Sequence, residues 1–144
     1  MIAIDHLLYQ LHITDQTMTQ LFEKRLGISL TRYELLQFLL EFAPCNQIRV
    51  QEVLKIDQAA LTRHFKILEE NGYITRKRNP KNQREIMVEL TDFAREQLII
   101  SPPQHHRLVK EQMEGILSPE ESVILRDLLE KLISGLETIA IDND

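Results

Sequence analysis

The sequence contains few residues that break or cross-link a chain. Its 144 residues include one cysteine, four glycines and five prolines, and it has no tryptophan. A single cysteine excludes an intrachain disulfide and fits a reducing cytoplasm. Few glycines and prolines favour long helices. A chain of this length can bury a core without disulfides or a structural metal.

Signals for export, membrane insertion and catalysis are also missing. The N-terminal sequence MIAIDHLLYQ has no basic leader, so we expect no signal peptide. No apolar run approaches the ~18 residues that would suggest a membrane span. The sequence has no glycine-rich phosphate loop, nucleophile elbow or HExxH motif. We therefore expect a cytoplasmic protein that is not an enzyme and that carries no cofactor and no metal.

Positive charge is concentrated in one segment of an acidic chain. The net charge is −5, but residues 62–84 carry seven basic residues against two glutamates, which gives 7 − 2 = +5 and leaves −10 for the rest. The basic residues are Arg63, Lys66, Arg76, Lys77, Arg78, Lys81 and Arg84. A basic segment in an acidic protein indicates a polyanionic partner such as nucleic acid.

Apolar residues at three- and four-residue spacing predict helices ahead of this segment. The first covers about residues 4–26 and ends at Gly27. A capping box from Thr31 to Glu34 begins the second, which ends near Pro44. Residues 51–55 provide one to two further helical turns.

The next predicted helix covers residues 58–71, between an Asp57 N-cap and a stop at Gly72. Its apolar residues Leu61, Phe65 and Leu68 share one face. The opposite face is small, polar or basic, and consists of Gln58, Ala59, Thr62, Arg63 and Lys66.

Period-two alternation then predicts a β-hairpin with a basic tip. Its strands cover residues 73–78 and 84–90, joined by turn residues 79–83. Thr91-Asp92 opens a long helix, interrupted at Ser101-Pro102-Pro103 and ending near Gly115.

A capping box with proline at the first helical position, Ser118-Pro119-Glu120-Glu121, begins the last helix. This helix has a wide apolar band, which indicates a partner. The band contains Val123, Ile124, Leu125, Leu128, Leu129, Leu132, Ile133, Leu136 and Ile139.

The order of these elements predicts a winged helix-turn-helix: a mainly α fold with a small β-hairpin wing. A helix fits the major groove of DNA, where short side chains near its N-terminus read bases. We expect DNA contacts from Gln58, Ala59, Thr62, Arg63 and Lys66 in the major groove. The wing residues Lys81, Asn82 and Arg84 would approach the minor groove, whose negative potential favours arginine.

With these motifs in this order, nearly the whole chain resembles the MarR family of bacterial transcriptional regulators. Residues 57–64 are similar to the start of that family's recognition helix, and residues 68–74 to its entry into the wing. The wing, residues 79–84 and 88–91, and the helix start at residues 117–121 resemble the corresponding family segments.

The wing departs from the family at two positions. The family usually has aspartates where this chain has Asn79 and Asn82. Such an aspartate would orient the wing arginine through a charged pair. Asn82 can hydrogen-bond Arg84 without that charge, and the loss of negative charge makes the wing more attractive to phosphate.

The resemblance implies a homodimeric, sequence-specific regulator of double-stranded DNA, expected to act as a repressor. Within a single domain of residues 1–144, it implies a DNA-binding lobe at 31–91 and a helical dimerisation region at 1–27 and 92–144. A two-fold dimer would read a pseudo-palindromic operator with half-sites about one helical turn, ~10 bp, apart.

The resemblance also implies release by a small phenolic or lipophilic effector, bound between the DNA-binding lobe and the dimer helices. Tyr9, His12, Tyr33 and Phe42 are candidates to line that cleft, although each fits a core position equally well.

Three alternatives remain open from the residues alone. Cys45 would sense redox state only with a lowered pKa, and the sequence shows no cationic neighbour. Histidines 6, 12, 64, 105 and 106 lack the i, i+4 spacing of a helical metal pair, which disfavours a metal-responsive regulator. A helical interaction module that kept the fold without binding DNA is the third.

Overall fold

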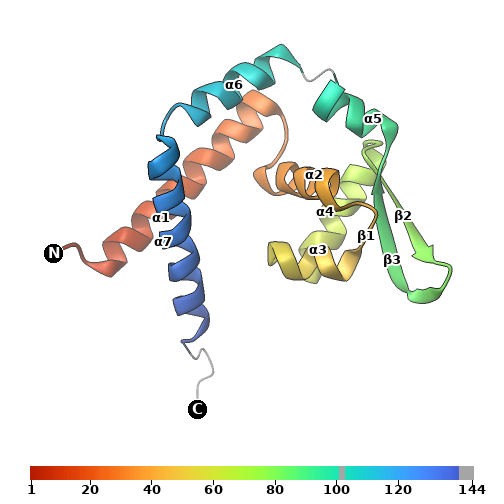
Figure 1. Ribbon diagram of the computed structural model, residues 1–144, viewed down its shortest axis with the longest axis horizontal. Coiled ribbons are helices and arrows are strands. Elements are labelled where there is room, and N and C mark those ends of the chain that lie inside the picture. Colours follow the sequence, from red (N-terminus) through yellow and green to blue (C-terminus); the bar gives the residue numbers. More distant parts are fainter. Residues whose placement is uncertain (101–102, 140–144) are drawn as a thin grey trace. The chain divides into compact units, whose positions relative to one another are not determined.

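A computed structural model describes residues 1–100 and 103–139 (Figure 1). The chain forms two compact units, Met1–His106 and Arg107–Asp144. The first unit contains α1 (Ile4–Leu21), η1 (Phe22–Leu26), α2 (Leu30–Phe42), β1 (Cys45–Asn46), α3 (Gln47–Leu54), α4 (Gln58–Glu70), β2 (Ile74–Asn79), β3 (Asn82–Leu90), α5 (Asp92–Arg95) and η2 (Glu96–Ile100). This mainly helical fold with one small antiparallel sheet confirms the predicted fold class.

The first predicted helix is present and its last turn widens. α1 continues into the π-helical turn η1, and Gly27 follows with φ +68°. That left-handed conformation favours glycine, which has no Cβ to clash. Gly27 therefore ends the helix as predicted.

The second helix begins earlier than the sequence predicted. Ser29 is the N-cap of α2, and its hydroxyl accepts a hydrogen bond from the Arg32 N–H at 3.2 Å. Thr31 lies inside the first turn, so the predicted capping box from Thr31 to Glu34 is wrong. Ser29 and Thr31 both have a hydroxyl group near the start of this helix. Ser29 is the one that caps it.

A two-residue strand and a longer third helix were also missed. β1 pairs antiparallel with β3, with Cys45 opposite Val88, so Cys45 lies in a strand. α3 then covers Gln47–Leu54, with Asn46 accepting from the Ile48 N–H at 2.7 Å. A two-residue strand is too short to show alternation, so only its pairing with β3 defines it.

The core lies among α2, α3, α4 and the sheet. Its fully buried side chains include Leu35 and Leu39 from α2, Val50 from α3, Phe65 from α4 and Val88 from β3. Because these apolar side chains are buried, the opposite faces of α4 and of the hairpin are the ones that face solvent.

The C-terminal part contains α6 (Gln104–Glu114) and α7 (Pro119–Glu137). Of the predicted interruption at Ser101-Pro102-Pro103, Ser101 and Pro102 lie outside the described residues, and Pro103 belongs to no helix, since α6 begins at Gln104. The capping box of α7 is confirmed, since Ser118 accepts from the Glu121 N–H and Glu121 accepts from the Ser118 N–H. None of the helices in the described part combines the length and apolar character that a bilayer span requires.

Candidate DNA interface

α4 has one buried face and one exposed face. Leu61, Phe65 and Leu68 are at most 1% exposed, as the spacing predicted. The five residues predicted to contact DNA are all exposed: Gln58, Ala59, Thr62, Arg63 and Lys66. The Asp57 cap is confirmed, with its carboxylate accepting from the Ala60 N–H at 3.1 Å. α4, labelled in Figure 1, is therefore anchored by its apolar side chains and presents exposed polar and basic side chains to solvent.

The Thr62 hydroxyl is already engaged within the helix. It donates to the backbone carbonyl of Gln58 at 2.9 Å. Its oxygen keeps acceptor capacity, and its methyl group is available for apolar contact. Thr62 can therefore accept a hydrogen bond or make an apolar contact without breaking this bond, but it cannot also donate.

An arginine from α2 reaches α4, a contact that the sequence did not indicate. The Arg32 guanidinium donates to Nδ1 of His64 at 3.3 Å. Because arginine is only a donor, the imidazole accepts, which requires the neutral ring. Burial, followed by the charges of Arg32 and Arg63, lowers the pKa of His64. His64 is thus held neutral beside the exposed Arg63.

The wing is a hairpin with a tighter turn than predicted. β2 and β3 pair from Ile74–Leu90 to Asn79–Asn82, and only Pro80 and Lys81 form the turn. The predicted turn of residues 79–83 is therefore too long, since Asn79, Asn82 and Gln83 belong to strands. Thr91 closes the base of the hairpin by donating to the Gly72 carbonyl at 2.6 Å.

The basic residues of the first wing strand have separate partners. Arg76 forms an ion pair with Glu69 of α4, with Nη2 and Oε1 3.1 Å apart. Arg78 donates to the Gln83 carbonyl at 2.8 Å, which connects the two strands. Arg76 and Arg78 thus have structural contacts within the lobe, and the charge of +5 overstates the number of cations available to a partner.

The two asparagines of the wing hold its backbone. Asn79 accepts from the Lys81 N–H at 3.0 Å and donates to the Glu85 carboxylate at 2.9 Å. Asn82 accepts from the backbone N–H of Arg84 at 3.1 Å. The predicted hydrogen bond between Asn82 and Arg84 therefore exists, but it positions the arginine backbone instead of its guanidinium.

Cys45 does not have the properties of a reactive thiol. It is 4% exposed, and burial raises the pKa of the thiol. The structure does bring a cation near it, Arg49, whose charge acts in the opposite direction but is outweighed. A buried thiol with a raised pKa is a poor nucleophile, so the geometry gives no support to redox sensing.

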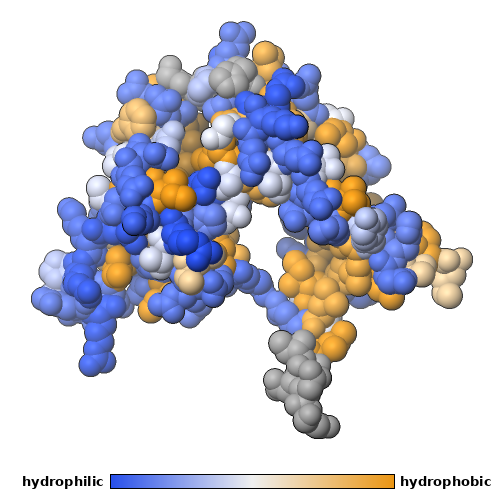
Figure 2. Space-filling model, turned by 180° about the vertical axis from the view of Figure 1, so that it is seen from behind, coloured by the Kyte–Doolittle hydropathy of each residue, from blue (hydrophilic) through white to orange (hydrophobic). Residues whose placement is uncertain are grey.

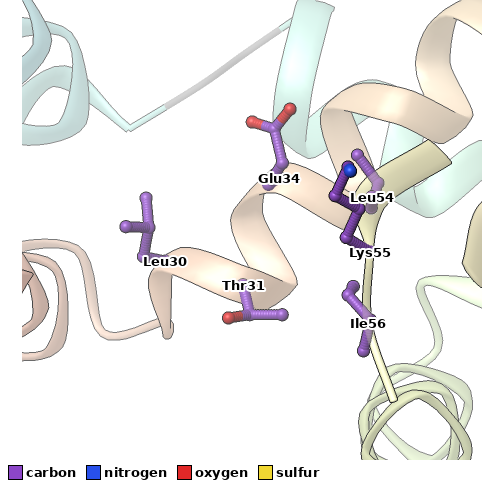
Figure 3. A pocket seen from close by; sticks show the side chains of 6 residues that line it. All are labelled: Leu30, Thr31, Glu34, Leu54, Lys55 and Ile56. Carbon is purple, nitrogen blue, oxygen red and sulfur yellow. The ribbon is translucent and has the colours of Figure 1, made fainter. Parts of the chain in front are cut away.

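One cavity of about 420 Å³ lies between α2 and the turn after α3. Leu30, Thr31 and Glu34 line it from α2, and Leu54, Lys55 and Ile56 from the opposite side (Figure 3). None of the four effector candidates lines this cavity.

Each of those four candidates instead has an aromatic or cationic neighbour. Tyr33 contacts Phe22 with ring centroids 5.4 Å apart, and Tyr9 lies 5.9 Å from His12. Phe42 packs on Phe38, and the Arg49 guanidinium lies 5.2 Å from its ring centroid.

Acidic, histidine and cysteine side chains are the usual protein ligands of metal ions. In the part of the chain that the structure describes, no group of three such side chains is arranged to hold an ion. The side chain of His105 lies outside that part.

Comparison with known proteins identifies the family. Residues 28–86 match the model of the MarR family. The uncharacterised HTH-type transcriptional regulator YdgJ of Bacillus subtilis is 36% identical over 133 residues, which cover 92% of this chain and 80% of that protein. The chain belongs to the MarR family. Proteins of this family are DNA-binding transcriptional regulators, which confirms the predicted class of function and the prediction that the chain is not an enzyme.

Solved structures agree with this MarR-family assignment. A probable transcriptional regulator from Pseudomonas aeruginosa superimposes with a TM-score of 0.73 at 27% identity, covering 86% of this chain and 94% of that chain. A cysteine-to-serine variant of MarR from E. coli, complexed with operator DNA, gives a TM-score of 0.73 at 26% identity, covering 90% and 94%. Both similarities extend well beyond residues 28–86.

Sequence reasoning missed three residues of this interface: Arg32, Glu69 in its role as an ion-pair partner, and Glu85. Arg32 and Glu85 lie outside the basic segment of residues 62–84. The asparagine at position 79 was a usable signal, because a substitution that removes charge at a hairpin tip suggests a compensating change nearby. Its partner became visible only with the strand register.

Proposed function

We propose that this MarR-family chain binds a pseudo-palindromic operator as a homodimer and acts in the cytoplasm as a repressor. The observation that carries the proposal is the two-faced character of α4. Leu61, Phe65 and Leu68 anchor the helix in the core, while Gln58, at its first turn, and Arg63, on the opposite side, are exposed. A rigid helix with an exposed polar face is the element that reads the major groove in helix-turn-helix proteins.

Within α4 the residue types suggest a division of roles. Gln58 suits adenine, Ala59 suits a thymine methyl group, and Arg63 suits guanine. Lys66 lies about one turn after Arg63, and we assign it to a phosphate contact, which positions the helix on the duplex. Thr62 already donates its hydroxyl proton to the Gln58 carbonyl, so we assign it to a base contact through its oxygen or its methyl group.

The wing would contact the minor groove. Lys81, Asn82 and Arg84 are exposed at the hairpin tip, and arginine is favoured in narrow minor grooves by their negative potential. Asn82 already holds the Arg84 backbone, so we assign it a positioning role together with any contact of its own.

Exposed apolar surface supports self-association. α7 has no buried residue, and Ile124 and Leu128 are 59% and 58% exposed. Figure 2 shows apolar side chains exposed along α7, at the lower right. α1 likewise has no buried residue, and its apolar side chains Ile4, Leu8 and Ile13 are exposed. Amphipathic helices with uncovered apolar faces need a partner, and a second copy satisfies both at once.

Effector control is proposed from family membership, with a small phenolic or lipophilic molecule as the ligand. The division into a DNA-binding lobe at 31–91 and a dimerisation region at 1–27 and 92–144 is likewise a proposal. A non-DNA-binding interaction module would have the same fold and differ in its response to duplex DNA.

The deciding experiment is selection of bound sequences from a random duplex pool by the full-length protein at moderate salt. We expect a two-fold symmetric motif with half-site centres ~10 bp apart. Binding of the selected duplex should weaken steeply with salt, with a log–log slope of about −0.9 per phosphate contact. Failure to retain any duplex even at low salt would overturn the proposal in favour of the interaction module.

A further inference from the structure

The tip of the wing contains a bulge, which side-chain hydrogen bonds hold in addition to the pairing of the two strands. Arg78 of β2 pairs with Ile86 of β3, but the next residue, Asn79, pairs with Asn82. The register therefore skips three residues of β3 at this point. Residues 83–85 therefore bulge out of β3, with Arg84 in the middle. A bulge redirects a side chain away from the strand direction, so the exposed Arg84 projects from the tip by this device.

Side chains hold the bulge on each side of Arg84. Before it, Arg78 donates to the Gln83 carbonyl at 2.8 Å, and Asn82 accepts from the Arg84 N–H at 3.1 Å. After it, the Glu85 carboxylate accepts from the Asn79 amide at 2.9 Å. The same Asn79 accepts from the Lys81 N–H, so one side chain joins the turn to the far end of the bulge.

The contact between Asn79 and Glu85 requires a donor at position 79. An amide has both a donor and an acceptor, whereas an ionised carboxylate only accepts. An aspartate at position 79 would keep the bond from the Lys81 N–H but would place two carboxylates at hydrogen-bond distance. Like charges that close repel strongly, particularly where burial reduces solvent screening, and this contact is partly buried.

We propose that Asn79 is a positioning residue of the wing: its amide holds Glu85 and the turn in place, so that the bulge presents Arg84 to DNA. Because Glu85 is a carboxylate, position 79 requires an amide that can donate to it. This inference rests on the proposed DNA-binding role of Arg84. Asparagine at position 79, where the family usually has aspartate, is thus matched to Glu85, because its amide donates to the Glu85 carboxylate.

Four full-length variants test the clamp: Asn79→Asp, Glu85→Gln, Asn79→Asp/Glu85→Gln and Asn79→Asp/Glu89→Gln. In the first double variant, the amide introduced at position 85 can donate to the carboxylate introduced at position 79, which restores the bond in reversed polarity. Glu89 is exposed on β3, opposite Thr75. The second double variant therefore has the same net charge as the first, and as the wild type, without restoring the bond.

The first readout uses the protein without DNA. The backbone order parameter of Arg84, from nitrogen relaxation, should be near ~0.85 in the wild type and fall toward ~0.6 in Asn79→Asp. It should recover in Asn79→Asp/Glu85→Gln and stay low in Asn79→Asp/Glu89→Gln. A role of Asn79 in net charge alone would leave this value unchanged in every variant.

The second readout is affinity for the selected operator at fixed salt. We expect Asn79→Asp to weaken binding about tenfold in the wild-type background and less than about twofold in the Glu85→Gln background, since contacting residues couple by this much. Equal losses in the two backgrounds, or equal rescue by Glu89→Gln, would overturn the clamp. If no variant and no wild type binds duplex, the DNA role fails, while the order parameters still decide whether the clamp exists.

Discussion

The Glu69 carboxylate at the end of α4 accepts hydrogen bonds from the Arg76 guanidinium on β2, at 3.1 Å to Nη2 and 3.4 Å to Nε. This two-point contact connects α4, the proposed recognition helix, directly to the wing. Arginine matches carboxylate geometry with two donors, which fixes orientation as well as distance. The two parts proposed to contact DNA are therefore joined by a directional bond as well as by the short connection at Gly72.

Substitution Glu69→Gln tests the contribution of this pair to stability. The Arg76 hydrogen bond is the main cause of the lowered pKa of Glu69. A carboxyl group whose pKa is lower in the folded state stabilises the fold at pH values above its pKa in the unfolded chain. This stabilisation is lost as the pH falls through its pKa in the folded state. Because Glu69 is 42% exposed, we expect the variant to lose only ~0.5 kcal/mol near neutral pH.

Urea unfolding of wild type and Glu69→Gln across a pH series measures this effect. The two free energies of unfolding should converge as the pH falls below 4.5, the ordinary value for the group. A constant difference at all pH values would show that the pair acts through packing and not through charge.

His64 predicts a second loss of stability on acidification, of the same sign as that of Glu69 but at higher pH, because the ordinary pKa of histidine is 6.5 and that of glutamate is 4.5. Because the pKa of His64 is lowered in the folded protein, its ring stays neutral there. As the pH falls through 6.5, the ordinary pKa of histidine, the unfolded chain therefore takes up a proton first. The wild type should therefore lose stability on mild acidification more than His64→Gln, whose amide oxygen can still accept from Arg32. Thermal unfolding at several pH values measures the difference, with His12→Gln, an exposed site on α1, as the matched control.

Arg84→Ala should weaken binding across many duplex sequences, because wing contacts position the protein more than they read bases. We expect the magnitude of the log–log salt slope to fall by about 0.9, the value for one lost phosphate contact. Lys110→Ala removes an equal charge from an exposed position on α6 and should leave the slope unchanged. An unaltered slope for Arg84→Ala would remove the wing arginine from the mechanism.

Gln58→Ala and Arg63→Ala should each change base preference at one position per half-site, by about 1–3 kcal/mol. Repeated selection from the random pool measures this change. Lys66→Ala is the comparison, since loss of a phosphate contact should weaken all sequences equally. An unchanged selection profile would show that Gln58 and Arg63 face phosphate or solvent.

Leu128→Glu should disrupt the proposed dimer. A charge placed on a face that becomes buried costs several kcal/mol, so we expect the dissociation constant to rise by two to three orders of magnitude, or roughly 3–4 kcal/mol. Ser134→Glu adds the same charge on the polar side of α7, beside Asp127 and Glu130 in the helical repeat. Light scattering at micromolar concentration measures both, and a wild type that is already monomeric would contradict the proposal.

Much of α4 was predictable because its determinants are local. The Asp57 cap, the Leu61, Phe65 and Leu68 spacing and the left-handed Gly72 lie within a few residues of each other. The same holds for the Ser118 capping box of α7. Where two local solutions compete, as Ser29 and Thr31 do at the start of α2, sequence reasoning chose the wrong one.

Contacts between distant residues were not predictable in the same way. The pairings of Arg32 with His64 and of Cys45 with Val88 join residues 32 and 43 positions apart. They depend on how α2 packs against α4 and on the register of β3. Neither quantity follows from periodicity, which tells only which side of an element is apolar.

The sequence by itself determined the family, the two-faced recognition helix, the basic hairpin and the apolar last helix, because periodicity, caps and charge are local properties. Only the tertiary structure decided which basic residues remain available. It paired Arg76 with Glu69, used Arg78 to close the strands, and left Arg63 and Arg84 exposed. The physical reason is that a charge gains its role from the groups within a few ångströms of it, and strand register and helix packing bring those groups there.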